Sequence, residues 1–252
     1  QHGANPAGGI VTSLQKHLKT RIYLVLALVG AVAAPVAAQP SGEDALIDKI
    51  IAAYGERRQV LSVRSYRMEA GLRARARGEE ADVIRIAEGS SRLKVLVRYP
   101  DSIEIRVLDG DQAWRGGAAH DLVLVQGPLR GAIVLQAARA TLPWILDQLR
   151  TKTHLIGTRD SAPVLEISVG EGMVVRAIID PQTYRIVRSE GALRLGGQEI
   201  RFETEYSDFR TVDGVLFAFH EENYASGTHT GTTIVKNIQL NPVGSALHLP
   251  LK

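Results

Sequence analysis

The chain has 252 residues, with 30 Lys and Arg against 27 Asp and Glu, and it contains no cysteine. The lack of cysteine excludes disulfide frameworks, cysteine-ligated zinc and thiol nucleophiles. Three of the basic residues and none of the acidic residues fall within 1–38, so residues 39–252 carry 27 charges of each sign. The basic overall balance therefore belongs to the N-terminal segment and does not indicate binding to nucleic acid.

The N-terminal segment is predicted to be a cleavable secretory signal. Basic residues between 16 and 21 precede an apolar run over 22–34, and small residues lead up to Ala38 before a polar stretch. This is the order of a signal peptide. The alternative is an uncleaved anchor, but the apolar run is shorter than the roughly 20 residues of a membrane span. We therefore expect removal of residues 1–38 and a free, periplasmic, monomeric protein that does not span a membrane.

Two different periodicities follow in the first half of the remaining chain. Apolar residues such as Leu46 and Ile50 recur at three- and four-residue spacing, which predicts a helix over 43–54. From about 60 to 126 the period changes to two, most cleanly at 103–107. Such alternation is typical of antiparallel strands with one buried and one solvated face.

Helical spacing returns once before strands resume. Residues 128–150 place Ile133, Trp144 and Ile145 among their apolar positions, and Pro143 divides the segment into two short helical pieces. The strands expected after it cover residues 153–158, 163–169, 172–180, 184–190, 199–207, 211–222 and 230–240.

These elements predict one α+β domain over residues 39–252. Its single antiparallel sheet of about 11 strands is too large to stay flat, so it is expected to curve into an incomplete β-barrel. Two or three helices remain to cover the concave face. A curved sheet covered by helices encloses an apolar cavity, which is where small apolar ligands bind.

Four stretches resemble a known family. They are the opening helix that ends in AAYG, then RYPDSIEIRVLDGDQAW, IIDPQTYRIVR, and YSDFRTVDGVLFAF followed by IQLNP. In order and spacing, over about 43–250, they resemble the periplasmic lipoprotein-carrier (LolA-like) and outer-membrane lipoprotein-sorting family. The resemblance implies an incomplete β-barrel whose cavity holds lipoprotein acyl chains or other lipids beneath a helical lid. The lid residues would be Leu46, Ile50, Ile133, Trp144 and Ile145.

The sequence departs from the family pattern at one position. Tyr99 precedes Pro100 where the typical carrier has an arginine that helps to hold the lid, and Arg98 lies one residue earlier. A shift of one residue in a strand moves a side chain to the opposite face. Arg98 is therefore not expected to take over the lid role.

The apolar members of the alternating strands are the candidate ligand lining. They are Val95, Val97, Ile103, Ile105, Val107, Trp114, Leu122, Leu124, Phe202, Phe217 and Phe219. The alternative is an ordinary packed core, because sequence alone does not separate a filled barrel from a hollow one. With the resemblance added, we predict a non-enzymatic carrier or binder of lipid or lipoprotein acyl chains.

A second hypothesis is an interaction module of the same fold, such as a stress sensor or assembly factor of the cell envelope. Arg73, Arg75 and Arg77 alternate with apolar residues, and in a strand they would form a docking stripe for an acidic partner or lipid phosphates. The alternative is a solvated face balanced by neighbouring carboxylates.

No metal, cofactor or catalytic site is expected. His220, Glu222 and His229 lack the spacing of a helical zinc site, and Asp109 and Asp111 flank a glycine as in a tight hairpin. Solvated hairpins explain both clusters. A hydrolase would need a dense polar cluster inside the cavity, and the sequence does not indicate one.

Overall fold

The computed structural model describes residues 42–118 and 121–243, so the predicted signal and its cleavage site lie outside the described residues. The helices are α1 (Gly42–Ala53), α2 (Arg57–Ser62) and α3 (Gly127–Ala140), with a short 3₁₀ segment, η2 (Arg150–Lys152). The strands before α3 are β1 (Ser65–Ala74), β2 (Glu79–Glu88), β3 (Arg92–Arg98), β4 (Ile103–Asp109), β5 (Gln112–Gly116) and β6 (Val123–Val125). The later strands are β7 (Thr153–Arg159), β8 (Ala162–Gly170), β9 (Met173–Ile179), β10 (Ile186–Leu195), β11 (Gln198–Val212), β12 (Val215–Ala225) and β13 (Thr228–Leu240).

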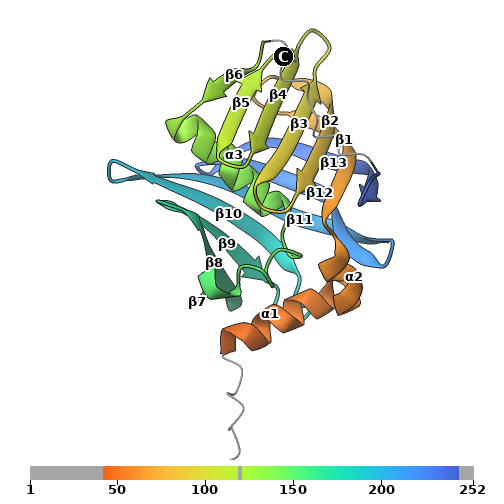
Figure 1. Cartoon of the computed structure of the whole chain (residues 1–252), viewed down its shortest axis with the longest axis vertical. Coiled ribbons are helices and arrows are strands. Elements are labelled where there is room, and N and C mark those ends of the chain that lie inside the picture. The colour runs from red at the N-terminus through yellow and green to blue at the C-terminus, as the bar shows by residue number, and fades with distance from the viewer. Residues whose placement is uncertain (1–41, 119–120, 244–252) are drawn as a thin grey trace, which may run out of the picture. The chain divides into compact units, whose positions relative to one another are not determined.

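All described strands belong to one antiparallel sheet of 13 strands (Figure 1). Strands that follow one another in sequence pair, except β6 and β7, and β1 also pairs with β13, from Tyr66 opposite Leu240 to Ala74 opposite Gly231. The sheet therefore has two wings, β1–β6 and β7–β13, joined at their first and last strands. Strands β6 and β7 remain as edges, which confirms the predicted incomplete barrel, with 13 strands instead of about 11.

Three local predictions have different outcomes. The helix expected over 43–54 is α1, whose Leu46 and Ile50 are buried. Helix α2 was missed, because a six-residue helix is too short to establish a period. The prediction of a second helical piece before residue 150 is wrong. Thr141 ends α3, donating from its hydroxyl to the carbonyls of Ala137 (3.1 Å) and Ala138 (3.2 Å), and turns follow.

Helix α3 lies against both wings of the sheet. It contacts β4 and β5 on one side and β8, β9 and β10 on the other, and Figure 1 shows it crossing between the two sets of strands. Glycines permit this close approach. A Cβ on Gly131 would lie 3.0 Å from Leu193 Cδ2, and one on Gly191 would lie 3.0 Å from the Leu135 Cβ. The helix thus covers the concave face of the sheet.

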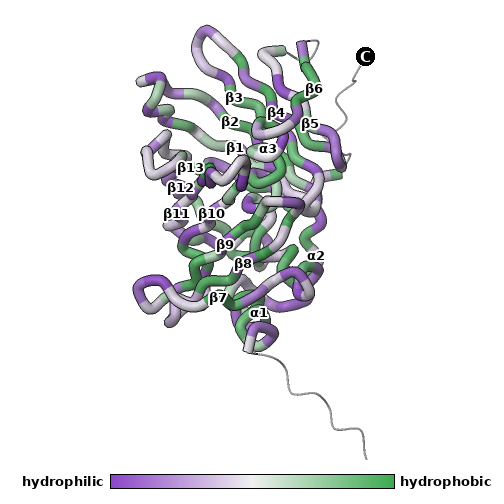
Figure 2. The backbone as a smooth tube through the Cα atoms, turned by 90° about the vertical axis from the view of Figure 1, so that its left-hand side faces the viewer, coloured by the Kyte–Doolittle hydropathy of each residue, from purple (hydrophilic) through white to green (hydrophobic). Residues whose placement is uncertain are grey.

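The other helices close one end of the domain. Figure 2 shows hydrophobic stretches in β8, β9 and α1 at that same end. The backbone N–H of Leu216 donates to the Tyr54 carbonyl at 2.8 Å, so the end of α1 is fixed to the β11–β12 hairpin. Among the described residues, no helix is both long and apolar enough to cross a membrane.

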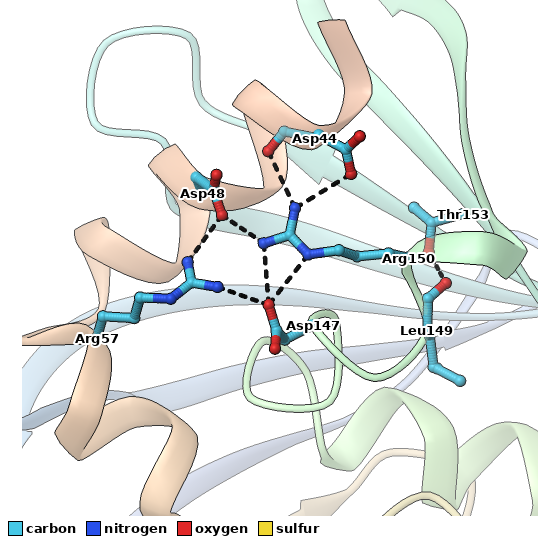
Figure 3. A network of polar contacts seen from close by, with 7 residues as sticks. All are labelled: Asp44, Asp48, Arg57, Asp147, Leu149, Arg150 and Thr153. Carbon is cyan, nitrogen blue, oxygen red and sulfur yellow. Dashed lines mark hydrogen bonds and ion pairs between the residues drawn. The ribbon is translucent and has the colours of Figure 1, made fainter. Parts of the chain in front are cut away.

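An ion-pair network fastens α1 and α2 to the segment after α3 (Figure 3). Arg150 donates to Asp44, Asp48 and Asp147. Arg57 donates to Asp48 and to Asp147, and both of these Arg57 contacts are 2.7 Å long. The two arginines share the carboxylates, so ordering one side chain also orders its neighbours. Because these side chains are 23–51% exposed, each pair stabilises the fold by only about 0–1 kcal/mol.

We predict that this network makes the fold sensitive to acid. Hydrogen bonds from Arg150 and Arg57 lower the pKa of Asp48 below its ordinary value. A lowered pKa in the folded state stabilises the protein above the unfolded-state pKa, and the gain is lost as pH falls through the folded-state value. Asp48→Asn should reduce the free energy of unfolding at pH 7 by at most about 1 kcal/mol.

Urea unfolding of wild-type protein and of Asp48→Asn measures the difference between their free energies of unfolding. We expect this difference to shrink as the pH falls below about 4, where the wild-type carboxyl takes up its proton. Asp101→Asn, at an exposed carboxyl in the β3–β4 turn, is the matched control and should have little effect at either pH. A destabilisation of the Asp48 variant that is equal at pH 7 and pH 3 would contradict the prediction.

Close approach of α3 to β10 gives a second prediction. In Gly191→Ala the new methyl group meets Leu135 at 3.0 Å and Arg139 Nε at 3.4 Å, so the helix must shift. Overpacking of this kind typically costs about 1–3 kcal/mol. Chemical denaturation should show that loss for Gly191→Ala and little change for Gly42→Ala, where a Cβ has nothing within 4 Å. Equal stability of the two variants would show that α3 adjusts freely.

Candidate functional site

A cavity of about 400 Å³ lies between α3 and the inner face of the sheet. Its apolar wall comes from both wings and from the helix: Leu72, Val83, Val95, Val97, Ile133 and Phe202. Turn residues Ala76 and Tyr99 also border it, whereas Arg85 and Arg139 border both this cavity and a smaller one of about 60 Å³. The smaller cavity lies among Tyr66, Trp144 and Phe217 and their neighbours.

Register decides which residues of the predicted lining face inward. Val95 lies opposite Arg106, and Val97 lies opposite Glu104. Directly paired residues share a face, so Arg106 and Glu104 point inward, and Ile103, Ile105 and Val107 lie on the opposite face. The prediction that Ile103, Ile105 and Val107 line the cavity therefore assigned the wrong face of β4 to the interior.

The rest of the predicted lining is divided in the same way. Trp114 lies opposite both Val107 and Leu124, so these three share the outer face. Leu122 precedes β6 and lines neither of the two inner cavities. Phe202 borders the larger inner cavity and Phe217 the smaller one.

Phe219 is buried and alternates with Phe217 on the inner face of β12, without bordering either cavity. The apolar part of the cavity wall that sequence analysis identified therefore consists of Val95, Val97 and Phe202, with Phe217 behind it.

The predicted lid residues are all buried, but they occupy different places. Ile133, on α3, borders the larger cavity. Trp144 borders the smaller one, where its ring lies 5.8 Å from Tyr66 and 4.9 Å from Phe217. Leu46, Ile50 and Ile145 belong to the packed core and border neither inner cavity. Helix α3 thus covers the larger cavity, while α1 closes the packed end.

A charged pair lies in the wall between the two cavities. Arg85 of β2 donates from Nη1 and Nη2 to the two carboxylate oxygens of Glu221 on β12, each at 2.8 Å. Glu221 is 6% exposed. Burial by itself lowers the pKa of the Arg85 guanidinium, but the charges and hydrogen bonds of Glu221 and Tyr66 together outweigh burial, so that the pKa is raised. Arg85 therefore stays a cation, held in place by both contacts.

A second arginine continues this polar wall. Nη1 of Arg139, on α3, donates to the Thr204 hydroxyl at 2.8 Å, and Thr204 donates to Asn223 Oδ1 at 3.0 Å. The Ser189 and Tyr206 hydroxyls form a separate hydrogen bond of 2.7 Å. Sequence analysis missed this polar wall. The available signal was the charge at Arg85, between Val83 and Ala87, and at Glu221, two residues after Phe219.

The three arginines predicted as a docking stripe do not form one strand face. Strand β1 ends at Ala74, so Arg75 and Arg77 lie in the turn to β2. Arg73 pairs with Glu80 at 3.6 Å. The Arg77 guanidinium lies 4.2 Å from the centre of the Tyr99 ring, on the rim of the larger inner cavity.

Other side chains singled out in sequence analysis are engaged in local contacts. Glu222 accepts hydrogen bonds from His220 (2.7 Å), His229 (2.6 Å) and Thr232 (2.7 Å). The described residues hold no group of three His, Asp or Glu side chains arranged for a metal ion.

Asp109 and Asp111 lie at the β4–β5 turn. Asp109 pairs with Arg92 at 3.0 Å, Asp111 pairs with Arg130 at 3.6 Å, and Gly110 between them has a φ of 59°. This is the geometry of a hairpin turn.

Arg98 is exposed and lies opposite Asp82 in the register of β2 and β3. It therefore points away from the larger inner cavity, on the face opposite Val97. Tyr99, at the position where the typical carrier has an arginine, places an aromatic residue at the rim of that cavity.

No family model matches the sequence, and no curated protein matches it either. Solved structures match in fold. A LolA superfamily protein from Nitrosomonas europaea has 11% identity and a TM-score of 0.51, and the match covers 79% of this chain and 94% of that one. A DUF1329 family protein from Desulfovibrio piger has 11% identity, a TM-score of 0.51, and coverage of 80% and 94%.

A protein from Vibrio parahaemolyticus described as an outer membrane lipoprotein-sorting protein domain has 12% identity and a TM-score of 0.48, with coverage of 80% and 93%. At identities this low, structural likeness concerns the fold and not the activity. The open 13-stranded sheet with α3 against its concave face is nonetheless the arrangement that the resemblance in sequence implied. The chain has a LolA-like fold.

Proposed function

We propose that residues 39–252 form a non-enzymatic, periplasmic carrier or binder of lipids, which holds an acyl chain in the cavity beneath α3. The observation that carries the proposal is the cavity of about 400 Å³ between the helix and the inner face of the sheet. Small-molecule sites generally have volumes of about 300–1,000 Å³. Burying an acyl chain in such a site contributes roughly 0.8 kcal/mol per CH₂ group, so apolar contact alone binds the chain tightly.

The polar wall does not favour a hydrolase. Ser189 is the hydroxyl that would act as nucleophile, and its hydrogen-bond partner is the Tyr206 hydroxyl at 2.7 Å. Burial raises the pKa of Tyr206, so this phenol keeps its proton at neutral pH and does not act as a base. A serine nucleophile needs a base within hydrogen-bond reach. The described hydrogen bonds of Ser189 supply none.

A second candidate, docking of a protein partner, is favoured by the edges of the sheet. Val123 and Leu124 on β6 are 62% and 50% exposed, and Leu155 and Ile156 on β7 are 42% and 52% exposed. Edge strands with exposed apolar side chains are where an extended peptide adds to a sheet. In this alternative the edges, and not the arginines at 73–77, would carry recognition.

The lipid proposal predicts that a bulky residue placed in the cavity expels the ligand. Ala132 lies on α3 and borders the larger inner cavity, so Ala132→Trp should fill part of its volume. We expect lipid that co-purifies with the protein, measured by native mass spectrometry, to fall on the order of tenfold, equivalent to about 1.4 kcal/mol of affinity. Leu129→Trp, at an exposed position of the same helix, is the matched control and should retain its lipid.

Bare wild-type protein in native mass spectra, together with no gain in thermal stability when lipids are added, would refute the proposal. Equal lipid content in the Ala132 and Leu129 variants would place the ligand outside the larger inner cavity.

A further inference from the structure

The guanidinium of Arg139 lacks a carboxylate that binds it directly within the part of the chain that the structure describes. Nη1 donates to the Thr204 hydroxyl at 2.8 Å, while Nε is buried and has no hydrogen-bond partner. Two carboxylates act on the cation through space, those of Glu221 and Glu203. Glu221 is already paired with Arg85 at 2.8 Å, and Glu203 lies 4.0 Å from Arg188.

This arrangement leaves the Arg139 guanidinium without a carboxylate in direct contact among the described residues. Burial lowers the pKa of Arg139, and Arg85 acts on it in the same direction. A guanidinium nitrogen that is buried without a hydrogen-bond partner is costly, and perturbed titratable groups of this kind cluster at functional sites. An anion beside Arg139 would offset that cost.

Arg139 also lies at a defined place in the larger inner cavity. It borders this cavity together with Val83, Val95 and Phe202, and it borders the smaller cavity as well. It therefore belongs to the wall between the two. The larger cavity has Arg85 and Arg139 at this wall, and Arg77 lies at its rim beside Tyr99. Leu72, Val83 and Val97 are among its apolar residues, and Arg106, Gln136 and Glu203 also border it. Such a site is complementary to an amphiphile with one charged end.

We propose, on the basis of the lipid-binding function proposed above, that the larger inner cavity binds a single-chain amphiphile by its anionic head group, with Arg139 as the residue that contacts the head. The head lies at the wall formed by Arg139 and Arg85, and the chain runs toward Ala76 and Tyr99. Arg85 supports the site from behind, because its two Nη atoms are occupied by Glu221. The planar guanidinium of Arg139 suits either a carboxylate or a phosphate.

The experiment compares three ligands that share one chain and differ in the head: palmitate, hexadecyl phosphate and hexadecanol. Affinities are measured by calorimetry on delipidated full-length protein in detergent-free buffer. Wild-type protein should bind at least one of the two anions on the order of tenfold more tightly than the neutral alcohol. The tighter of the two anions identifies the head group as carboxylate or phosphate.

Two variants test the role of Arg139. Arg139→Gln should lower the affinity for the preferred anion on the order of tenfold and leave that for hexadecanol nearly unchanged, while Arg139→Lys should recover part of the loss. Arg130→Gln is the matched control, because Arg130 lies on the same helix and borders neither of the two inner cavities. Should Arg139→Gln fail to fold, the head-group preference of the wild-type protein and the affinities of Arg139→Lys still test the proposal.

The outcomes separate this inference from the function on which it rests. Equal binding of all three ligands by wild-type protein would overturn the anionic head group and leave lipid binding in place. Loss of hexadecanol binding together with anion binding in Arg139→Gln would show a structural role for the arginine and would also overturn the inference. Failure of all three ligands to bind would overturn both proposals.

Discussion

Pairing of the first strand with the last is the constraint on which the remaining structure depends. Strand β1 pairs with β13 from Tyr66 to Ala74, with a single irregularity between Glu69 and Ala70. Without this pairing the chain would form two separate meanders, each with two edges. With it, one continuous sheet of 13 strands forms, and a twisted sheet of that size must curve. Curvature creates the concave face that α3 covers.

The same pairing assembles the polar wall. Arg85 and Glu221 are 136 residues apart in the chain, and they meet because only β1 and β13 separate their strands. The pair is buried, and burying two charges is costly even when their hydrogen bonds are ideal. An apolar pair at these positions would serve stability as well or better. The charged pair is therefore weak evidence for stability, and its place beside the cavity and Arg139 supports the proposed binding of an anionic head group.

Helix α3 decides how much of the interior stays open. Gly131 and Gly191 bring the helix close to β10, where Leu135 and Leu193 are buried. On the side of β2 and β3, the small side chains of Ala132 and Val95 leave the larger inner cavity. The network around Arg150 lies at the other end of the covering segment and ties it to α1 and α2. The helix is therefore held at both ends across the space that it covers.

The sequence by itself determined the elements whose signals are local. The apolar spacing of Leu46 and Ile50 produced α1, and the glycines at 110 and 196–197 produced hairpin turns, since each signal acts within a few residues. Alternation also established that β3 and β4 have two faces. Their pairing register, which only the tertiary structure supplies, decided that Leu108 and not Val107 points inward. The tertiary structure alone also placed Arg85 beside Glu221. Contacts between residues far apart in the chain depend on the register of the strands between them, and they leave no local pattern in the sequence.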